Sequence, residues 1–136
     1  MNDRHLEDVL GRQWPRAAEE SMLPAPGSAY QAFGRAADHP VCTLHCGLGK
    51  EGYRSFAYLH LDSDSRFSAD GRGHVIVIRF AGLMPVQITI RGRNLIRLYD
   101  ALHQHRTPWI MRADRDFTEG DEPVVTAIDF EELKDP

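Results

Sequence analysis

The residues best suited to chemistry lie where an expected strand gives way to an expected helix. Arg91, Arg93 and Asn94 surround a glycine there, in the order Arg-Gly-Arg-Asn. The first N–H groups of a helix lack partners, and the helix dipole attracts negative charge to that end. Two guanidinium groups would complete a clamp for a phosphate or carboxylate, with His60 or His103 as proton donor. The pattern predicts a small-anion site, but it is also typical of an exposed tight turn before a capping asparagine.

A glycine-rich stretch has the letters of a nucleotide-binding loop but not its context. Gly47, Gly49 and Gly52 have the spacing of a dinucleotide-binding loop. Such a loop must open a helix, whose N-terminus then holds the pyrophosphate. The residues that follow, 53–61, alternate as a strand does. We therefore interpret the stretch as a hairpin turn.

The cysteines and histidines do not have the spacing of a zinc site. On a strand, Cys42 and Cys46 face one side while His45 faces the other, and no second ligand pair follows. The two cysteine α-carbons would lie about 13 Å apart, beyond disulfide reach. Cys46 can still meet His60 across a hairpin as nucleophile and base, but a buried cysteine more often acts as a small hydrophobe. We expect no metal, no cofactor and two reduced thiols.

Charge is distributed unevenly along the chain. The net charge is −4, with six arginines against two aspartates from residue 91 to 115, and eight acids against one lysine from residue 116 onward. This balance does not favour a nucleic-acid partner. The acidic end either keeps the protein in solution or folds near the basic strip, and the basic strip would bind an anion or an acidic surface.

The elements that must position these residues belong to one expected α+β domain spanning 1–136. We expect a helical N-terminal segment at 1–40, a sheet-plus-helix core at 41–130 and an acidic tail at 131–136. Helical spacing and turn residues predict N-terminal helices at 2–14, 17–22 and 29–37.

Period-two alternation replaces helical spacing after residue 40. The expected strands are 41–46, 53–61, 75–80, 86–91, 109–112 and 124–130. The first four form an antiparallel meander, in which 62–73 is a long, mobile hairpin connection. Asn94 caps an amphipathic helix at 95–105 that packs on the sheet, and two C-terminal strands follow.

Two functional hypotheses follow from these residues. The first is a non-enzymatic interaction module that forms a dimer or binds a protein partner through an uncovered sheet face or edge, with Arg54, Phe56, Tyr58 and Ile96 at the interface. The alternative is a small-anion binding protein or enzyme that uses the arginine clamp. No apolar run is long enough to span a membrane, and the charged first residues do not resemble an export signal, so we expect a cytoplasmic protein.

Overall fold

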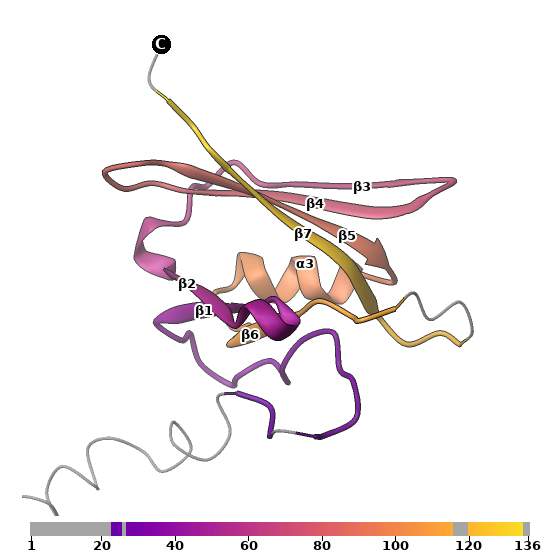
Figure 1. Cartoon of the computed structure of the whole chain (residues 1–136). Coiled ribbons are helices and arrows are strands. Elements are labelled where there is room, and N and C mark those ends of the chain that lie inside the picture. The colour runs from indigo at the N-terminus through magenta and orange to yellow at the C-terminus, as the bar shows by residue number, and fades with distance from the viewer. Residues whose placement is uncertain (1–22, 26, 116–119, 135–136) are drawn as a thin grey trace, which may run out of the picture.

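Strands build most of the structure. The computed structural model describes residues 23–25, 27–115 and 120–134. The four-stranded sheet has the order β3-β4-β5-β7 and is antiparallel throughout. Its strands are β3 (Arg66–Asp70), β4 (Gly73–Phe80), β5 (Val86–Arg93) and β7 (Val124–Glu132). Figure 1 shows this sheet as the upper layer of the molecule.

The second sheet has three strands and mixed pairing. Its strands are β1 (Thr43–Gly47), β2 (Tyr53–Ala57) and β6 (Trp109–Met111). β1 lies in the middle, antiparallel to β2 and parallel to β6. Short 3-10 turns follow β1 and β2, at Gly49–Glu51 and Tyr58–His60.

One helix, α3 (Ile96–His103), is present among the described residues and lies on the inner side of the four-stranded sheet (Figure 1). Two isolated backbone bridges reach the four-stranded sheet from residues just beyond strands of the smaller sheet: Leu61 pairs with Phe80 of β4, and Arg112 pairs with Val125 of β7. No helix in this part of the chain is long and apolar enough to cross a membrane.

The core explains why these segments fold as they do. Alternate residues of the long strands, such as Ile76, Ile78, Ile88 and Ile90, are fully or almost fully buried. They point to the same side of the sheet, where α3 covers them with its own apolar stripe. The stripe consists of Leu95, Leu98 and Leu102. The prediction that the face of the helix packs on a sheet is therefore confirmed.

The predicted meander is wrong in its pairing. A four-stranded antiparallel sheet is present, but two of its strands are β3 and β7, whereas β1 and β2 belong to the other sheet. β1 takes β6 as a parallel partner after a long crossover. Alternation shows that a segment is a strand but not which strand it pairs with, and this partner lies about sixty residues further along the chain.

Three local predictions are also wrong. The segment 62–73 is not a loop, because it contains β3 and a hairpin turn. The strand predicted at 53–61 ends at residue 57, since the chain tightens into a 3-10 turn before it reaches β4. Residues 29–37 form no helix, because their backbone bonds β6: Gly34 N–H donates to Trp109 O, and Met111 N–H donates to Ala32 O.

The remaining N-terminal helices, at 2–14 and 17–22, lie outside the described residues. The helix predicted at 95–105 is shorter, and β7 extends two residues into the predicted acidic tail.

Candidate functional site

The predicted anion clamp is not assembled around the start of α3. Asn94 has φ 58° and turns its amide away from the helix, donating to Asp121 O at 3.0 Å. Leu95 is the N-cap, and its N–H donates to His74 Nδ1 at 3.0 Å. The prediction that Asn94 caps the helix is therefore wrong, because a left-handed residue does not have the extended conformation of an N-cap.

The other members of the clamp are far apart. Arg91 is exposed on β5, and Arg93 is half-buried at the end of that strand. His60 lies beside Ala81, at the opposite end of β4 and β5 from the two arginines. Seven strand residues separate the two ends, about 23 Å. His103 lies one full helix length, about 12 Å, from the start of α3. The structure does not bring these five residues together.

The residues predicted for an interface divide between core and surface. Tyr58 is 2% exposed and donates its hydroxyl to Thr107 O at 2.6 Å, so its placement at an interface is wrong. Phe56 is half-buried and stacks on Phe80 at 4.9 Å. Arg54 and Ile96 remain accessible, and the Ile96 side chain is 54% exposed.

The cysteine and the histidines that the sequence suggested for catalysis or metal binding lie apart. His45 accepts or donates a hydrogen bond with Ser55 at 2.6 Å on the surface of the smaller sheet. Cys46 is fully buried, and burial raises the pKa of its thiol to about 12. It lies opposite Arg54 and not beside His60. No group of three or more potential metal ligands forms within the described part of the chain.

A hollow of about 790 Å³ lies between the 23–31 segment and the end of β6. Arg112, Asp114 and Arg115 all line it. Arg112 already donates to Leu48 O at 2.7 Å and lies 4.0 Å from Glu51.

The four-stranded sheet instead offers two exposed strand edges. In an antiparallel pair, every second residue turns its N–H and C=O toward the neighbouring strand. Asp70 and Gly73 flank the two-residue hairpin turn and form such a pair, so the next bonded position is Ser68. Phe67 and Ala69 therefore direct both backbone groups away from the sheet. We call these outward groups the β3 edge.

β7 forms the opposite edge by the same rule. Leu133 N–H donates to Pro85 O, which fixes the alternation along the β5–β7 pair. Ile128, Phe130 and Glu132 therefore direct their backbone groups outward. At the start of β7 the outward N–H of Val125 is taken by the Tyr30 hydroxyl at 2.9 Å. The outward groups of Ile128, Phe130 and Glu132 have no backbone partner among the described residues, and we call them the β7 edge.

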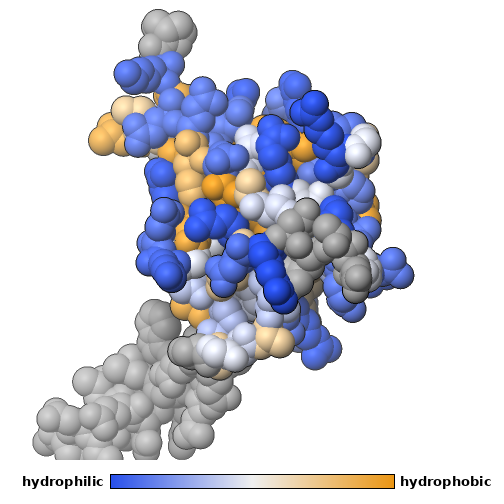
Figure 2. Space-filling view, turned by 45° about the vertical axis from the view of Figure 1, so that its right-hand side comes forward, coloured by the Kyte–Doolittle hydropathy of each residue, from blue (hydrophilic) through white to orange (hydrophobic). Residues whose placement is uncertain are grey.

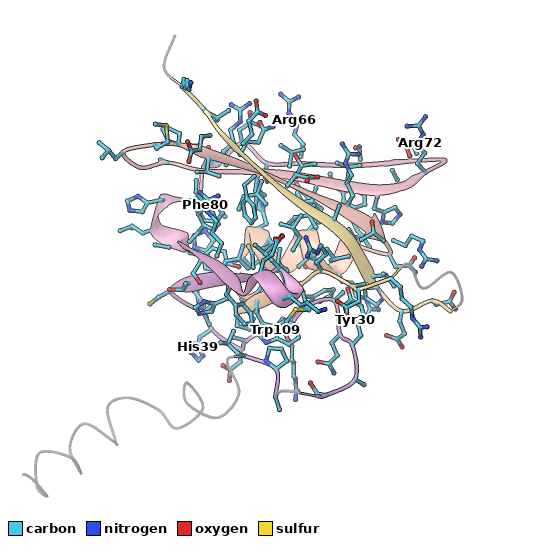
Figure 3. All side chains as sticks on the ribbon, in the orientation of Figure 1. Tyr30, His39, Arg66, Arg72, Phe80 and Trp109 are labelled. Carbon is cyan, nitrogen blue, oxygen red and sulfur yellow. The ribbon has the colours of Figure 1, made fainter. Side chains whose placement is uncertain are left out.

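Side chains of β3 alternate between the two faces of the sheet. Phe67 faces α3, with its ring centroid 5.6 Å from that of Tyr99. Arg66, Ser68 and Asp70 therefore face the other way. Figure 3 shows Arg66 on the side of the sheet opposite α3. An arginine and an aspartate thus flank Ser68 at equal spacing on one exposed face.

The side of α3 beneath β3 is partly apolar and exposed. The Tyr99 hydroxyl donates to Ser65 O at 3.2 Å, and His103 Nδ1 lies 3.1 Å from Ser65 Oγ. Ile96 shares this side of the helix, since it lies three residues before Tyr99 and seven before His103. We call Ile96, Tyr99 and His103 the α3 flank. A shallow hollow of about 500 Å³ lies on it.

Sequence reasoning missed the β3 edge because 62–73 is polar and rich in turn residues. Two features of the sequence predict the strand. Residues 66–70 alternate between polar and apolar, and Asp70 is followed by Gly71, a pair that is a strong hairpin signal between strands.

Comparison with models of known families, with curated proteins and with solved structures found no match to this chain, so the functional conclusion rests on the two edges and the residues around them.

Proposed function

We propose that this protein is a non-enzymatic interaction module that self-associates by pairing the β3 edge of one copy with the β3 edge of a second. The observation that supports this proposal is the self-complementary charge pattern on β3. Arg66 and Asp70 are both exposed and lie two residues to either side of Ser68. A two-fold axis through Ser68 therefore places each arginine opposite the partner copy's aspartate.

The backbone favours the same alignment. When Ser68 faces its counterpart in an antiparallel pair, Phe67 of one copy faces Ala69 of the other. These are the two residues whose N–H and C=O groups point outward, so each such pair exchanges both of its hydrogen bonds. The charge alignment and the hydrogen-bond alignment thus select one register.

The α3 flank adds apolar area beneath the paired strands. Phe67 and Tyr99 are half-buried within one copy, and Ile96 is 54% exposed. A two-fold axis beside β3 brings this flank toward the same flank of the second copy. Burial of such side chains supplies more free energy than exposed ion pairs, which contribute about 0.2–1 kcal/mol each. In this proposal, the flank provides affinity and the charges provide the register.

The anion-binding alternative has less support. It requires a histidine beside Arg91 and Arg93, but His103 lies about 12 Å from the start of α3 and His60 about 23 Å from the arginines, along the helix and strands.

Sedimentation equilibrium of the wild-type protein and the Ala69→Pro variant tests the proposal. Proline at position 69 removes an outward N–H from the β3 edge but breaks no hydrogen bond within one copy. Edge strands tolerate proline at positions of this kind, where the N–H points away from the sheet. We expect a monomer–dimer equilibrium at micromolar concentration for the wild type and a monomer for Ala69→Pro.

The matched control is Glu132→Pro, which removes an outward N–H from the β7 edge instead. It should dimerise like the wild type. A wild-type protein that stays monomeric up to 100 µM, or an Ala69→Pro protein that is well folded and still dimeric, would rule the proposal out.

A further inference from the structure

A half-buried arginine lies on two aromatic rings beside the second exposed edge. The Arg54 guanidinium carbon is 4.8 Å from the centre of the Phe130 ring and 5.3 Å from that of Phe56. Contacts of this kind hold a guanidinium flat against a ring and leave its N–H groups directed sideways. We call these three residues the Arg54 stack.

The Arg54 guanidinium has no hydrogen-bond partner within the described part of the chain. Besides the two aromatic contacts, the guanidinium interacts electrostatically with the buried Cys46 thiol opposite it, and no carboxylate among the described residues lies within ion-pair distance. Arg112 provides a contrast, because its guanidinium donates to Leu48 O at 2.7 Å. Arg54 is thus an oriented donor of up to five N–H groups, with the fork geometry that binds a carboxylate through two parallel hydrogen bonds.

The Arg54 stack lies directly under the β7 edge. Phe130 contributes its ring to the stack and its outward N–H and C=O to the edge. A strand added to this edge would place a residue opposite Phe130, with the two β-carbons about 5 Å apart on the same face. A carboxylate on that residue would reach the Arg54 guanidinium. Figure 2 shows exposed hydrophobic surface, interrupted by hydrophilic residues, on the face that β7 crosses.

The outer face of β7 is acidic. Asp129 and Glu131 are exposed and flank Phe130. Pairing of β7 with β7 of a second copy would place Asp129 opposite the partner copy's Glu131, and like charges directly opposite each other destabilise a sheet. A second copy is therefore a poor occupant of this edge, and lysine or arginine residues on the outer face of an added strand suit it well.

We infer that the β7 edge and the Arg54 stack form a binding site for an extended segment of a different protein. The segment adds to the sheet as a strand, with basic side chains toward Asp129 and Glu131 and one carboxylate toward Arg54. Its backbone provides affinity, and the alternating charge selects the partner. This site is separate from the β3 edge and does not depend on self-association.

The test is a calorimetric titration with a synthetic peptide of nine residues, the length of β7. The peptide alternates lysine with threonine and carries glutamate in place of its central threonine. We expect binding to the wild-type protein, and about tenfold weaker binding when that glutamate is replaced by glutamine, as for the loss of one charged hydrogen-bonded pair. A peptide with glutamates in place of the lysines should not bind.

Two protein variants test whether the carboxylate of the peptide glutamate binds at Arg54. Arg54→Met keeps an unbranched side chain on the aromatic rings but has no N–H group, so the glutamate and glutamine peptides should bind it equally. Arg54→Lys keeps the charge and should restore part of the difference. Circular dichroism and thermal melting show whether each variant is folded, and Ala69→Pro should bind the peptide like the wild type.

Absence of binding at millimolar peptide overturns the inference. So does a glutamate preference of the same size in wild type and Arg54→Met, or binding that Glu132→Pro leaves unchanged. None of these results would count against dimerisation through β3, because sedimentation in the absence of peptide tests that proposal separately.

Discussion

The two edges of the four-stranded sheet present the same backbone chemistry but different side chains. Each edge has outward N–H and C=O groups at alternate residues. On β3, Arg66 and Asp70 make the edge complementary to itself. On β7, Asp129 and Glu131 would lie opposite each other if the edge paired with a second copy, and we expect them to repel it. An exposed edge pairs readily with other chains, so its side chains must decide which chains those are.

The largest expected difference is in the free energy of unfolding when a glycine beside each edge strand is replaced. Gly92 lies at an irregularity between β5 and β7, and an added methyl group there would collide with the backbone carbonyl of Val124. Gly71, in the turn between β3 and β4, has nothing nearby. We expect Gly92→Ala to lower the free energy of unfolding by about 3 kcal/mol and Gly71→Ala by less than about 0.5 kcal/mol.

Urea denaturation of both variants measures this difference. Equal stabilities would mean that β7 has room to move away from β5, and the register used for the β7 edge would then need revision.

The next effect concerns the α3 flank. Ile96→Glu places a charge where two flanks meet, and we expect dimerisation to weaken by about 2 kcal/mol or more, roughly thirtyfold. Leu83→Glu is the matched control, because Leu83 is fully exposed on the β4–β5 turn and far from β3. Sedimentation equilibrium compares the two dissociation constants, and an equal change in both would show that the flank is not part of the interface.

A smaller effect tests the charges of β3. Arg66→Asp and Asp70→Arg each create like-charge contacts in the proposed register, so each should weaken the dimer by about 0.5–1 kcal/mol per contact. The double variant exchanges the two charges and should recover most of the wild-type affinity. Light scattering at several protein concentrations measures the recovery. If the double variant loses as much dimerisation free energy as the two single variants added together, these residues do not face each other.

The smallest effect is an expected absence of reaction at Cys46 of β1. Cys42 is exposed, whereas Cys46 is buried across from Arg54, and burial raises the pKa of the Cys46 thiol to about 12. At pH 8 an alkylating reagent should label Cys42 quickly and Cys46 only on unfolding, because the thiolate is the reactive form. Mass spectrometry of tryptic peptides reports each site. Rapid labelling of Cys46 in the folded protein would mean that the smaller sheet opens.

Strong periodicity predicted the interior well. Val75 to Phe80 and Val86 to Arg91 are dense in β-branched residues, and the apolar stripe of the following helix has a clear period, so the strands and the helix on the sheet followed from local pattern. The pairing of the strands did not follow from local pattern. The parallel pairing of β1 with β6 depends on how distant segments close the core, and alternation carries no information about that.

The candidate surfaces were predictable only in part. Ile96 was expected on the flank of the helix, and it is exposed there. Tyr58 was expected at an uncovered interface with Arg54 and Phe56, but the four-stranded sheet covers that side, where Phe56 and Tyr58 both lie against Phe80. The β3 edge was missed because a polar strand of five residues resembles a loop when its partner is unknown. The stacking of Arg54 on Phe130 joins two different sheets, which local sequence does not reveal.

Disulfide trapping of a Ser68→Cys variant tests the central claim most directly. In a Cys42→Ser background, the proposed register places residue 68 of the two copies directly opposite each other, with α-carbons about 4.5 Å apart and within disulfide range. Arg66→Cys is the control, because two copies of that position would lie about 13 Å apart. We predict that mild oxidation links Ser68→Cys into a covalent dimer and leaves Arg66→Cys monomeric. Failure of Ser68→Cys to cross-link, or equal cross-linking of both variants, would contradict the pairing of β3 with itself.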